Sequence, residues 1–407
     1  MKTTAEQVHF LKKGETPERM ATTGVSLHCH SLHSKELLDF VPYYAERIPV
    51  LRRFWHREMR KREIKYGRVP DFTSGYWEPP LTGADVFRSE IENMKGLGLS
   101  GMVSITDHDS IAANLELNAS SIDAPISMEW TVPFEQAFFH VGVHNLPAEK
   151  ATEITASLLD YSNNRSDSDN VRLADLFESL NRIPDILVVL NHPIWDIEMI
   201  GQVKHERLLK RFLERHKRSI HAVEINGFRS WGENQRVIDL GAELELPVIS
   251  GGDRHCCQSN TMINLTNAST FAEFVSEVRI DKKSSVAITP EYNIPLPSRQ
   301  LASMAQILSD YAHFPSERRL WSDRIMLDSR DGTGLRSLTD QWEGKRPFWS
   351  YLAIGSLKVL SHPAMRILIA LTVGDTDIGI ESGRELLENT TNTRPSISGE
   401  QLKPNTI

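Results

Sequence analysis

Short apolar runs rich in β-branched residues alternate along the chain with amphipathic segments of helical periodicity. The apolar runs are VSLHCH near residue 25, MVSITDH near 102, ISMEW near 126, FFHVGVH near 138, ILVVLNH near 186, HAVEING near 221 and PVISGGDRH near 247. Helix-compatible segments precede several of them, such as GADVFRSEIENMKGLG before the second run. Seven buried strands separated by amphipathic helices predict an α/β fold with a parallel sheet, open or closed into a barrel.

The segment 36–81 interrupts this alternation directly after the first strand. Its run LRRFWHREMRKREIKYG is compatible with a basic helix, and PDFTSGYWEPPLTG is typical of an ordered loop. An insertion at this point leaves a barrel on its carboxyl-terminal face, where active sites lie. Two interpretations are open: a solvated charged helix, or a lid whose Arg53 and Arg57 bind an anionic group of a substrate.

The pattern changes again after Pro290, where helix-like pieces replace the strands. We therefore expect a main domain over 1–290 and a mainly helical appendage over 291–407, with a frayed tail from Glu385. The apolar stretch FWSYLAIGSLKVLSHPAMRILIALTVG is interrupted by Lys358, a His-Pro pair and Arg366. These residues favour two short packed helices over a transmembrane segment.

Composition narrows the class of protein. The chain has 407 residues, of which 40% are hydrophobic and 25% charged, which is typical of a soluble globular protein. A net charge of −8 gives no general attraction to nucleic acid, so nucleic-acid binding is not favoured. The start lacks the apolar core of a secretory signal and there are only three cysteines, from which we expect a cytoplasmic protein with incidental thiols.

Histidines and carboxylates recur at or near the predicted carboxyl ends of the strands. They are His28 and His30, then Asp107, His108 and Asp109, then Glu129, His140, His192, Asp253 and His255. Side chains two apart in a strand point to the same side, so His28 and His30 should face one point. Because an α/β barrel assembles its active site at this end of its strands, the recurrence predicts a single site.

The chemistry of these ligands indicates metal binding. Neutral imidazoles mixed with carboxylates suit Mn²⁺, Zn²⁺ or Fe²⁺ better than Mg²⁺ or Ca²⁺. Six or seven such ligands exceed what one ion takes, so we expect at least two ions. Two close cations activate a bound water as hydroxide and stabilise an in-line displacement at phosphorus, which predicts hydrolysis of a phosphoester.

The order HxH, TDH, a strand-end Glu, a following His, NHP and GDxH resembles the PHP (polymerase and histidinol phosphatase) superfamily over residues 23 to about 280. The resemblance implies a distorted seven-stranded, TIM-like (β/α)7 barrel with a trinuclear metal site, hence two or three divalent ions. It also implies which residues are the ligands: His28, His30, His108, Glu129, His140, His192, Asp253 and His255.

Two positions depart from the pattern of that superfamily. Where many members have an aspartate shortly after the first motif, this chain has Lys35 and Glu36, so Glu36, or else Asp39, has to supply the carboxylate. Arg254 stands between the last two ligands, where it either pairs with a phosphate or forms an ion pair with a nearby acid. Arg254 and Asp107 are the candidate catalytic groups. Asp107 could instead accept a hydrogen bond from His108 and hold it in one tautomer.

The function expected from these features is hydrolysis of a small phosphorylated molecule, a phosphomonoester or a nucleotide, by a metal-bound hydroxide. A nuclease or polymerase-associated editing domain is an alternative of the same chemistry. A metal-binding structural protein without catalysis is another, and hydrolysis of a carboxylic ester or amide at the same metals is a third.

Overall fold

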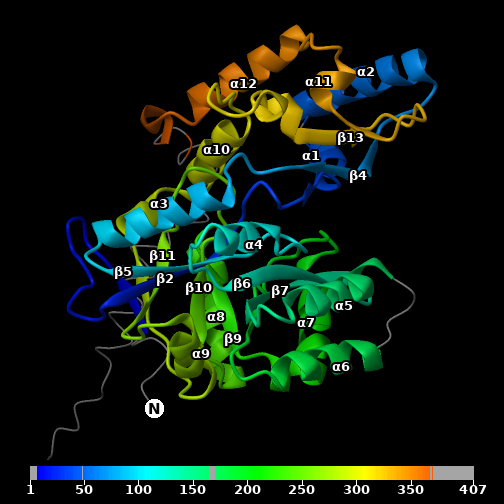
Figure 1. Ribbon diagram of the computed structural model, residues 1–407. Helices are drawn as coiled ribbons and strands as arrows, with labels where there is room; N and C mark the ends of the chain where they lie inside the picture. The colour runs from blue at the N-terminus through cyan, green and yellow to red at the C-terminus, as the bar shows by residue number, and fades with distance from the viewer. Residues whose placement is uncertain (1–6, 48, 165–169, 367–368, 370–407) are drawn as a thin grey trace, which may run out of the picture.

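The computed structural model describes residues 7–47, 49–164, 170–366 and 369, which form a mixed α/β protein (Figure 1). All seven expected strands are present. They are β2 (Thr23–Cys29), β5 (Ser100–Ile105), β6 (Ile126–Phe134), β7 (Ala137–Leu146), β8 (Leu187–Leu190), β9 (Ala222–Asn226) and β10 (Val248–Gly251). Three further strands that pair with these were not expected: β1 (Val8–Phe10), β11 (Met262–Thr266) and β12 (Val286–Ile288).

These strands form two five-stranded sheets, with the orders β1-β12-β11-β2-β5 and β10-β9-β8-β7-β6. Within the described residues their ladders do not close into one barrel. Two single-residue parallel bridges nevertheless join the two sheets. One bridge links Cys29 with Arg254 and the other links His108 with Glu129. The two sheets therefore meet at the end where the histidines gather.

The expectation of an all-parallel arrangement is wrong for β7, which runs antiparallel to both β6 and β8. The paired residues Phe134 and Ala137 are joined by two residues only, the length of a tight hairpin, and such a connection can link only antiparallel strands. His140 therefore lies near the beginning of its strand and not at the end. The reversal of β7 still brings it beside the carboxyl end of β8, where the Asn191 backbone amide donates to its carbonyl, while Thr131 in the middle of β6 pairs with it.

Amphipathic helices cover the sheets, as the periodicity predicted (Figure 1). They are α3 (Gly83–Gly96), α4 (Ala112–Ala119), α5 (Ala151–Asn163), α6 (Asn170–Asn181), α7 (Gln202–His216), α8 (Trp231–Leu244) and α9 (Phe271–Arg279). Local sequence fixes several of their starts. The Ser230 hydroxyl accepts a hydrogen bond from the Glu233 amide, and the Glu233 carboxylate accepts one from the Ser230 amide, a capping box that begins α8.

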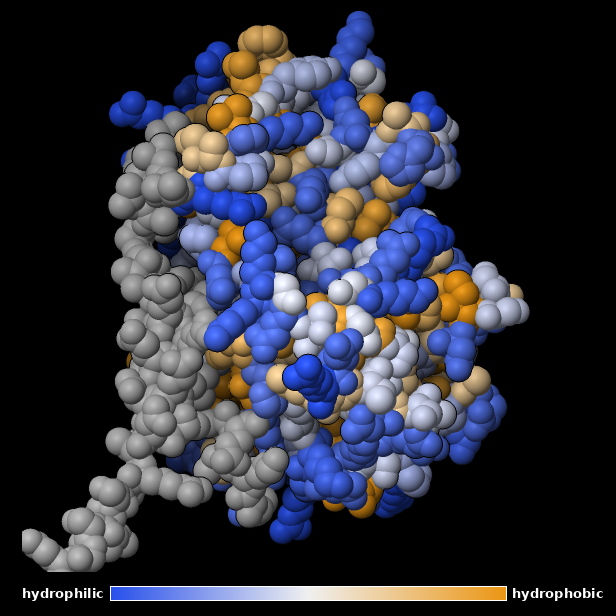
Figure 2. Space-filling model, turned by 90° about the vertical axis from the view of Figure 1, so that its left-hand side faces the viewer, coloured by the Kyte–Doolittle hydropathy of each residue, from blue (hydrophilic) through white to orange (hydrophobic). Residues whose placement is uncertain are grey.

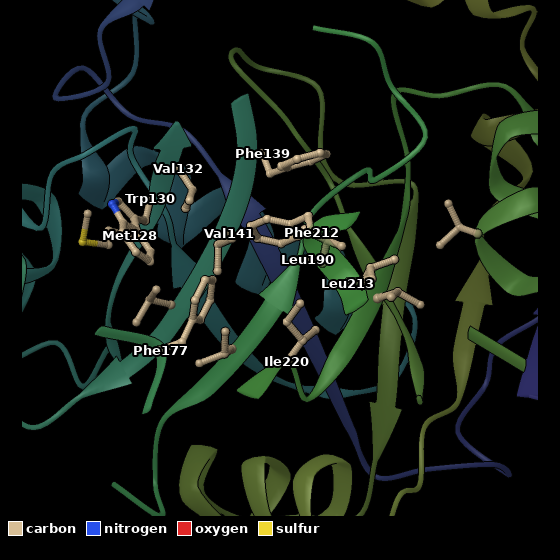
Figure 3. Packing of buried hydrophobic residues seen from close by; sticks show 14 of the residues in the cluster. Met128, Trp130, Val132, Phe139, Val141, Phe177, Leu190, Phe212, Leu213 and Ile220 are labelled. Atoms are coloured by element: carbon tan, nitrogen blue, oxygen red, sulfur yellow. The ribbon is translucent and has the colours of Figure 1, made fainter. Parts of the chain in front are cut away.

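The largest hydrophobic cluster lies between the second sheet and its helices (Figure 3). Phe212 of α7 is fully buried at its centre, with its ring 4.5 Å from that of Phe139 and 5.3 Å from that of Phe134. Trp130 is also fully buried, and its indole N–H donates to the Leu158 carbonyl and the Ser162 hydroxyl. This packing fixes the positions of β6 and β7, the strands that carry Glu129 and His140.

The insertion and the appendage build a third sheet together. The insertion contains β3 (Glu36–Leu37), α1 (Phe40–Arg47), α2 (Pro49–Tyr66) and β4 (Asp71–Trp77), so part of the expected loop is a strand. After Pro290 come α10 (Leu296–Ile307), β13 (Ile325–Asp328), β14 (Leu335–Ser337), α11 (Leu338–Gln341) and α12 (Phe348–Leu360). The sheet order β14-β13-β4-β3 shows that the two segments fold against each other.

Short 3-10 helices complete the described chain: Lys217–Ser219, Pro290–Asn293, Ser316–Arg318, Trp321–Arg324 and Pro363–Met365. None of the helices in the described ranges combines the length and apolar character that crossing a membrane requires. On the face in Figure 2, hydrophilic residues cover most of the described surface and hydrophobic ones form small groups among them. The tail expected to be frayed lies outside the described residues.

We predict that Phe212→Ala lowers the free energy of unfolding by about 3 to 5 kcal/mol, because it removes a large buried ring and leaves a cavity. Chemical denaturation of the variant and the wild type measures the difference. Val203→Ala in the same helix is the control, since Val203 is 72% exposed and its truncation should change the free energy of unfolding little. A loss below about 1 kcal/mol for Phe212→Ala would contradict this packing.

Candidate metal centre

Glu129 is the centre of a buried cluster of histidines. It lies in β6 and is fully buried. Its Oε2 lies 3.1 Å from His28 Nε2, 3.5 Å from His30 Nε2 and 3.2 Å from His108 Nδ1. Its Oε1 lies 3.3 Å from both His140 Nδ1 and His192 Nε2, and accepts a hydrogen bond from Nδ2 of the Asn191 side chain. Five imidazoles, carried by four strands or the loops directly after them, thus converge on one carboxylate.

Two further carboxylates complete the cluster. Asp253 Oδ1 lies 3.7 Å from His28 Nε2 and 3.6 Å from His30 Nε2. Glu36 Oε1 lies 3.1 Å from His255 Nε2, and Glu36 Oε2 lies 3.4 Å from His108 Nε2. Of the two carboxylates considered for this place, Glu36 is therefore the one in the cluster, whereas Asp39 is exposed.

All nine residues expected as ligands come together. Their donor atoms form four overlapping groups, each within 4.8 Å: His30, Glu36, His108 and His255; His28, His192 and Asp253; His28, His30 and Glu129; and His108, Glu129 and His140. Ring nitrogens of His28, His30, His108 and His140 and Oε2 of Glu129 are buried without a hydrogen-bond partner. Since unpaired buried polar atoms are costly, their convergence fits divalent cations.

Backbone strain accompanies the cluster. His28, His192 and Asp253 have φ values of 61°, 28° and 49°, in the left-handed region that residues with a Cβ rarely adopt. His28 lies at an irregularity in the β2–β5 pairing, between Ser26 and Cys29. Such residues persist only where their surroundings hold them, and they concentrate at functional sites.

Neighbouring polar groups orient the imidazoles. His28 Nδ1 lies 2.7 Å from Glu224 Oε2, so it donates to that carboxylate and leaves Nε2 toward the cluster. The Ser34 hydroxyl donates to Glu36, which leaves its oxygen to accept from His30 Nδ1 at 3.2 Å. In both residues Nδ1 is taken up by this contact, and Nε2 faces the other ligands.

The carboxylates control how the imidazoles titrate. Burial alone would lower the pKa of His28 and His108, but Glu129 with Glu224 raises the pKa of His28, and Glu36 with Glu129 raises that of His108 to about 10. Glu36 similarly raises the pKa of His255 against the effect of burial. His30 is different, because burial and the neighbouring His255 lower its pKa to about 3. The cluster therefore attracts positive charge, whether protons or cations.

The cluster has a buried side and an accessible side. The side chains of His28 and Glu129 are at most 1% exposed, whereas those of Glu36, His108 and His255 are 12%, 15% and 18% exposed. Solvent reaches the cluster on the side of these three residues. Trp77 of β4 stands there, with its ring 5.6 Å from that of His255.

Asp107 does not lie among the ligands. Its carboxylate accepts hydrogen bonds from the amide and the hydroxyl of Ser31, at 2.5 and 2.7 Å. Burial raises the pKa of Asp107 to about 6. Asp109 accepts from the Thr131 amide in the same way. Both carboxylates hold the loops that carry the histidines, so the expected catalytic role of Asp107 finds no support in this geometry.

Arg254 was expected to bind a phosphate or to pair with an acid, and the structure has the ion pair. Its buried guanidinium contacts Glu90 and also donates to the Ser89 hydroxyl and the Cys256 carbonyl. The cation that does face the cluster is Arg229, 3.4 Å from Asp253 Oδ2 and stacked 3.4 Å above the Trp195 ring. The sequence reasoning missed Arg229, although its place three residues after β9 was a usable signal.

Arg53 and Arg57 are exposed on α2. This helix packs through Phe54 against Trp349 of α12, with the rings 5.0 Å apart, and Arg62 bonds to Gln341 of α11. Figure 1 shows α2 beside these elements of the appendage. The expected role of both arginines in substrate binding therefore finds no support in the position of α2.

Histidines expected to be structural have local partners. His33 pairs with Glu116 at 3.0 Å, His144 lies 2.8 Å from the Ser104 hydroxyl, and His205 lies 2.9 Å from the Pro193 carbonyl. None of the three belongs to the four groups found in the described residues.

Comparison with known proteins adds little to this picture. No family model and no curated protein matches the chain. PsfC from Pseudomonas syringae is similar with a TM-score of 0.36 and 15% identity, over 52% of this chain and 86% of that one. A candidate metal-dependent phosphoesterase from Bifidobacterium adolescentis is similar with a TM-score of 0.34 and 14% identity, over 64% of this chain and 98% of that one. An amidohydrolase from Chromobacterium violaceum is similar with a TM-score of 0.29 and 15% identity, over 57% of this chain and 87% of that one. At such scores these likenesses carry no weight for activity.

We predict that Mn²⁺ binding releases protons and tightens as pH rises from 6 to 9. The metal-free protein holds protons on His28, His108 and His255 because their pKa values are raised, and ligation requires neutral imidazoles. Calorimetric titration in buffers of different ionisation enthalpy measures the number of protons released. An affinity that does not change across this pH range would contradict the proposed charge state.

Proposed function

We propose that this protein is a metal-dependent phosphoesterase of PHP type that hydrolyses a small phosphorylated molecule. The observation that carries the proposal is the convergence of six imidazoles and three carboxylates, with unpaired buried atoms facing one another. A structural metal site is closed and needs four ligands, whereas this cluster offers nine and has an accessible side. The arrangement fits two or three ions with room for a substrate.

Three of the four groups define which residues would hold each ion, and the fourth, His28, His30 and Glu129, joins them. His28, His192 and Asp253 form one position, and His108, Glu129 and His140 form a second. His30, Glu36, His108 and His255 form a third, for which Glu36 supplies the carboxylate. The donors suit Mn²⁺, Zn²⁺ or Fe²⁺. Such ions, when bound, supply an acidic water and neutralise the charge that develops on phosphate oxygens.

We further propose that the two large sheets together form a distorted seven-stranded barrel. The bridges Cys29 to Arg254 and His108 to Glu129 support the order β6-β7-β8-β9-β10-β2-β5, with the first and last strands adjacent. In this arrangement every ligand except Glu36 comes from a strand or a loop at one end of the barrel.

Arg229 would bind the substrate in this site. Its guanidinium is held by Trp195 and lies beside Asp253, and its Nε atom is buried without a hydrogen-bond partner. A planar cation fixed in this way binds phosphate oxygens through two parallel N–H groups. We therefore assign to Arg229 the phosphate contact that the sequence had suggested for Arg254.

We predict that His192→Ala and Asp253→Ala each reduce kcat on a phosphomonoester by more than about 100-fold, since loss of a group that only orients a ligand already costs about 10- to 100-fold. A panel of mononucleotides, bisphosphates and sugar phosphates, assayed with and without Mn²⁺, identifies the substrate for this comparison. His56→Ala is the control, because His56 is 63% exposed on α2. Near wild-type kcat in both ligand variants would falsify the assignment of the site.

A second comparison separates the two arginine assignments. Arg229→Ala should raise KM and lose about 1 to 3 kcal/mol of transition-state stabilisation, as expected when a charged hydrogen bond is removed. Arg53→Ala should leave kcat and KM unchanged, because Arg53 is exposed on a helix that packs against the appendage. If Arg53→Ala raised KM and Arg229→Ala did not, the lid interpretation of the insertion would replace ours.

A further inference from the structure

Two adjacent thiols follow the last ligand of the candidate metal centre. The loop after β10 carries Asp253 and His255, and then Cys256 and Cys257. The Sγ atoms of the two cysteines are 3.7 Å apart. The Tyr311 hydroxyl oxygen lies 3.6 Å from Cys256 Sγ and 3.7 Å from Cys257 Sγ. Because that hydroxyl donates to the Gln306 carbonyl at 2.8 Å, its oxygen is left to accept from the thiols and holds both sulfurs on one side of the loop.

The two thiols differ in their access to solvent. Cys256 is buried, whereas Cys257 is exposed and lines a cavity of about 510 Å³ between α3 and the segment around Phe314. An oxidant can therefore reach Cys257, and Cys256 stands behind it as the second sulfur. The remaining cysteine, Cys29, is fully buried in β2.

We propose that Cys256 and Cys257 are an oxidation site, which a peroxide converts into a disulfide between adjacent residues. Cys257 sulfur attacks one oxygen of hydrogen peroxide, the O–O bond breaks, and a sulfenic acid and one water form. Cys256 sulfur then attacks Cys257 sulfur, the S–O bond breaks, and the hydroxide leaves as water with the Cys256 proton. Two thiols lose two electrons and two protons, and the peroxide becomes two waters.

The oxidation would act on the metal centre through His255. Bringing the sulfurs from 3.7 Å to the length of a covalent bond, about 2.05 Å, requires the backbone at residues 256 and 257 to turn. His255 precedes them directly, stacks on His30 with a ring separation of 4.2 Å, and lies 3.1 Å from Glu36. Movement of its ring would weaken the ion position formed by His30, Glu36, His108 and His255.

Adjacent residues have Cα atoms about 3.8 Å apart, closer than in ordinary disulfides, so the bond is strained and easily reduced. Strained disulfides are the labile ones that act in regulation. The site is thus suited to reversible loss of metal. The effect on metal binding rests on the proposed function, whereas the oxidation itself does not.

The test uses the full chain, freed of metal with a chelator, treated with hydrogen peroxide, and then freed of peroxide with catalase. Mass spectrometry of a digest should show that the peptide containing residues 256 and 257 has lost two hydrogens. Thiol titration of the unfolded protein should fall from the three cysteines of the sequence to one. Mn²⁺ affinity should drop by about 10-fold or more and return after treatment with dithiothreitol.

Matched variants assign the effect to this pair of thiols. Cys257→Ser should bind Mn²⁺ as the reduced wild type does and should keep that affinity after peroxide. Cys29→Ala should still form the disulfide. Addition of oxygen to Cys257 without a disulfide, a disulfide between two chains, or unchanged Mn²⁺ affinity of the oxidised protein would overturn the proposal. If the reduced protein binds no Mn²⁺, the proposed function fails, and the mass of the peptide still decides whether the thiol pair is oxidised.

Discussion

The structure depends on compensating the charge of Glu129, a carboxylate with no exposure to solvent. An unpaired buried charge costs several kcal/mol, so it has to be surrounded by cations or donors. Here five imidazoles lie within 3.5 Å of its oxygens and Asn191 donates to it. With Glu36 and Asp253 the cluster holds three carboxylates. Because the pKa values of His28, His108 and His255 are raised, these imidazoles hold protons and supply positive charge in the absence of cations. Those imidazoles can exchange protons for metal without leaving the carboxylates uncompensated.

The features that could be predicted from the sequence are those that local patterns determine. Strands and potential ligands follow from local patterns. Short apolar runs predict the strands, and the residues at the end of each run are expected at the edge of the sheet where an active site forms. The direction of β7 was missed because a two-residue hairpin between apolar runs is easily overlooked beside the surrounding α/β alternation. The sequence left two roles open for Arg254, a phosphate contact or an ion pair with a nearby acid, and local pattern could not choose between them. With Asp253 and His255 facing the cluster, Arg254 had to face away, toward Glu90.

Long-range pairing could not be predicted. Ile325 pairs with Trp77 across nearly 250 residues, and no local pattern in either segment specifies the other. The insertion was therefore expected to be a helix with a loop, and the appendage to be mainly helical. Their pairing has a consequence for the site, because β4 also pairs with β3, where Glu36 stands opposite Trp77. The appendage thus helps to fix Glu36, the expected ligand that the small sheet carries.

This arrangement divides the site between two parts of the protein. The buried half, with His28, Glu129 and His192, is fixed by the two large sheets and their core, and its geometry should depend little on the insertion. The accessible half, with Glu36, His108 and His255, is bordered by β3 and β4, and Trp77 stands beside His255. Under the proposed function, ions held by the buried half would depend on the two large sheets. The accessible half borders the small sheet that the insertion and the appendage build together, so its geometry depends on both segments.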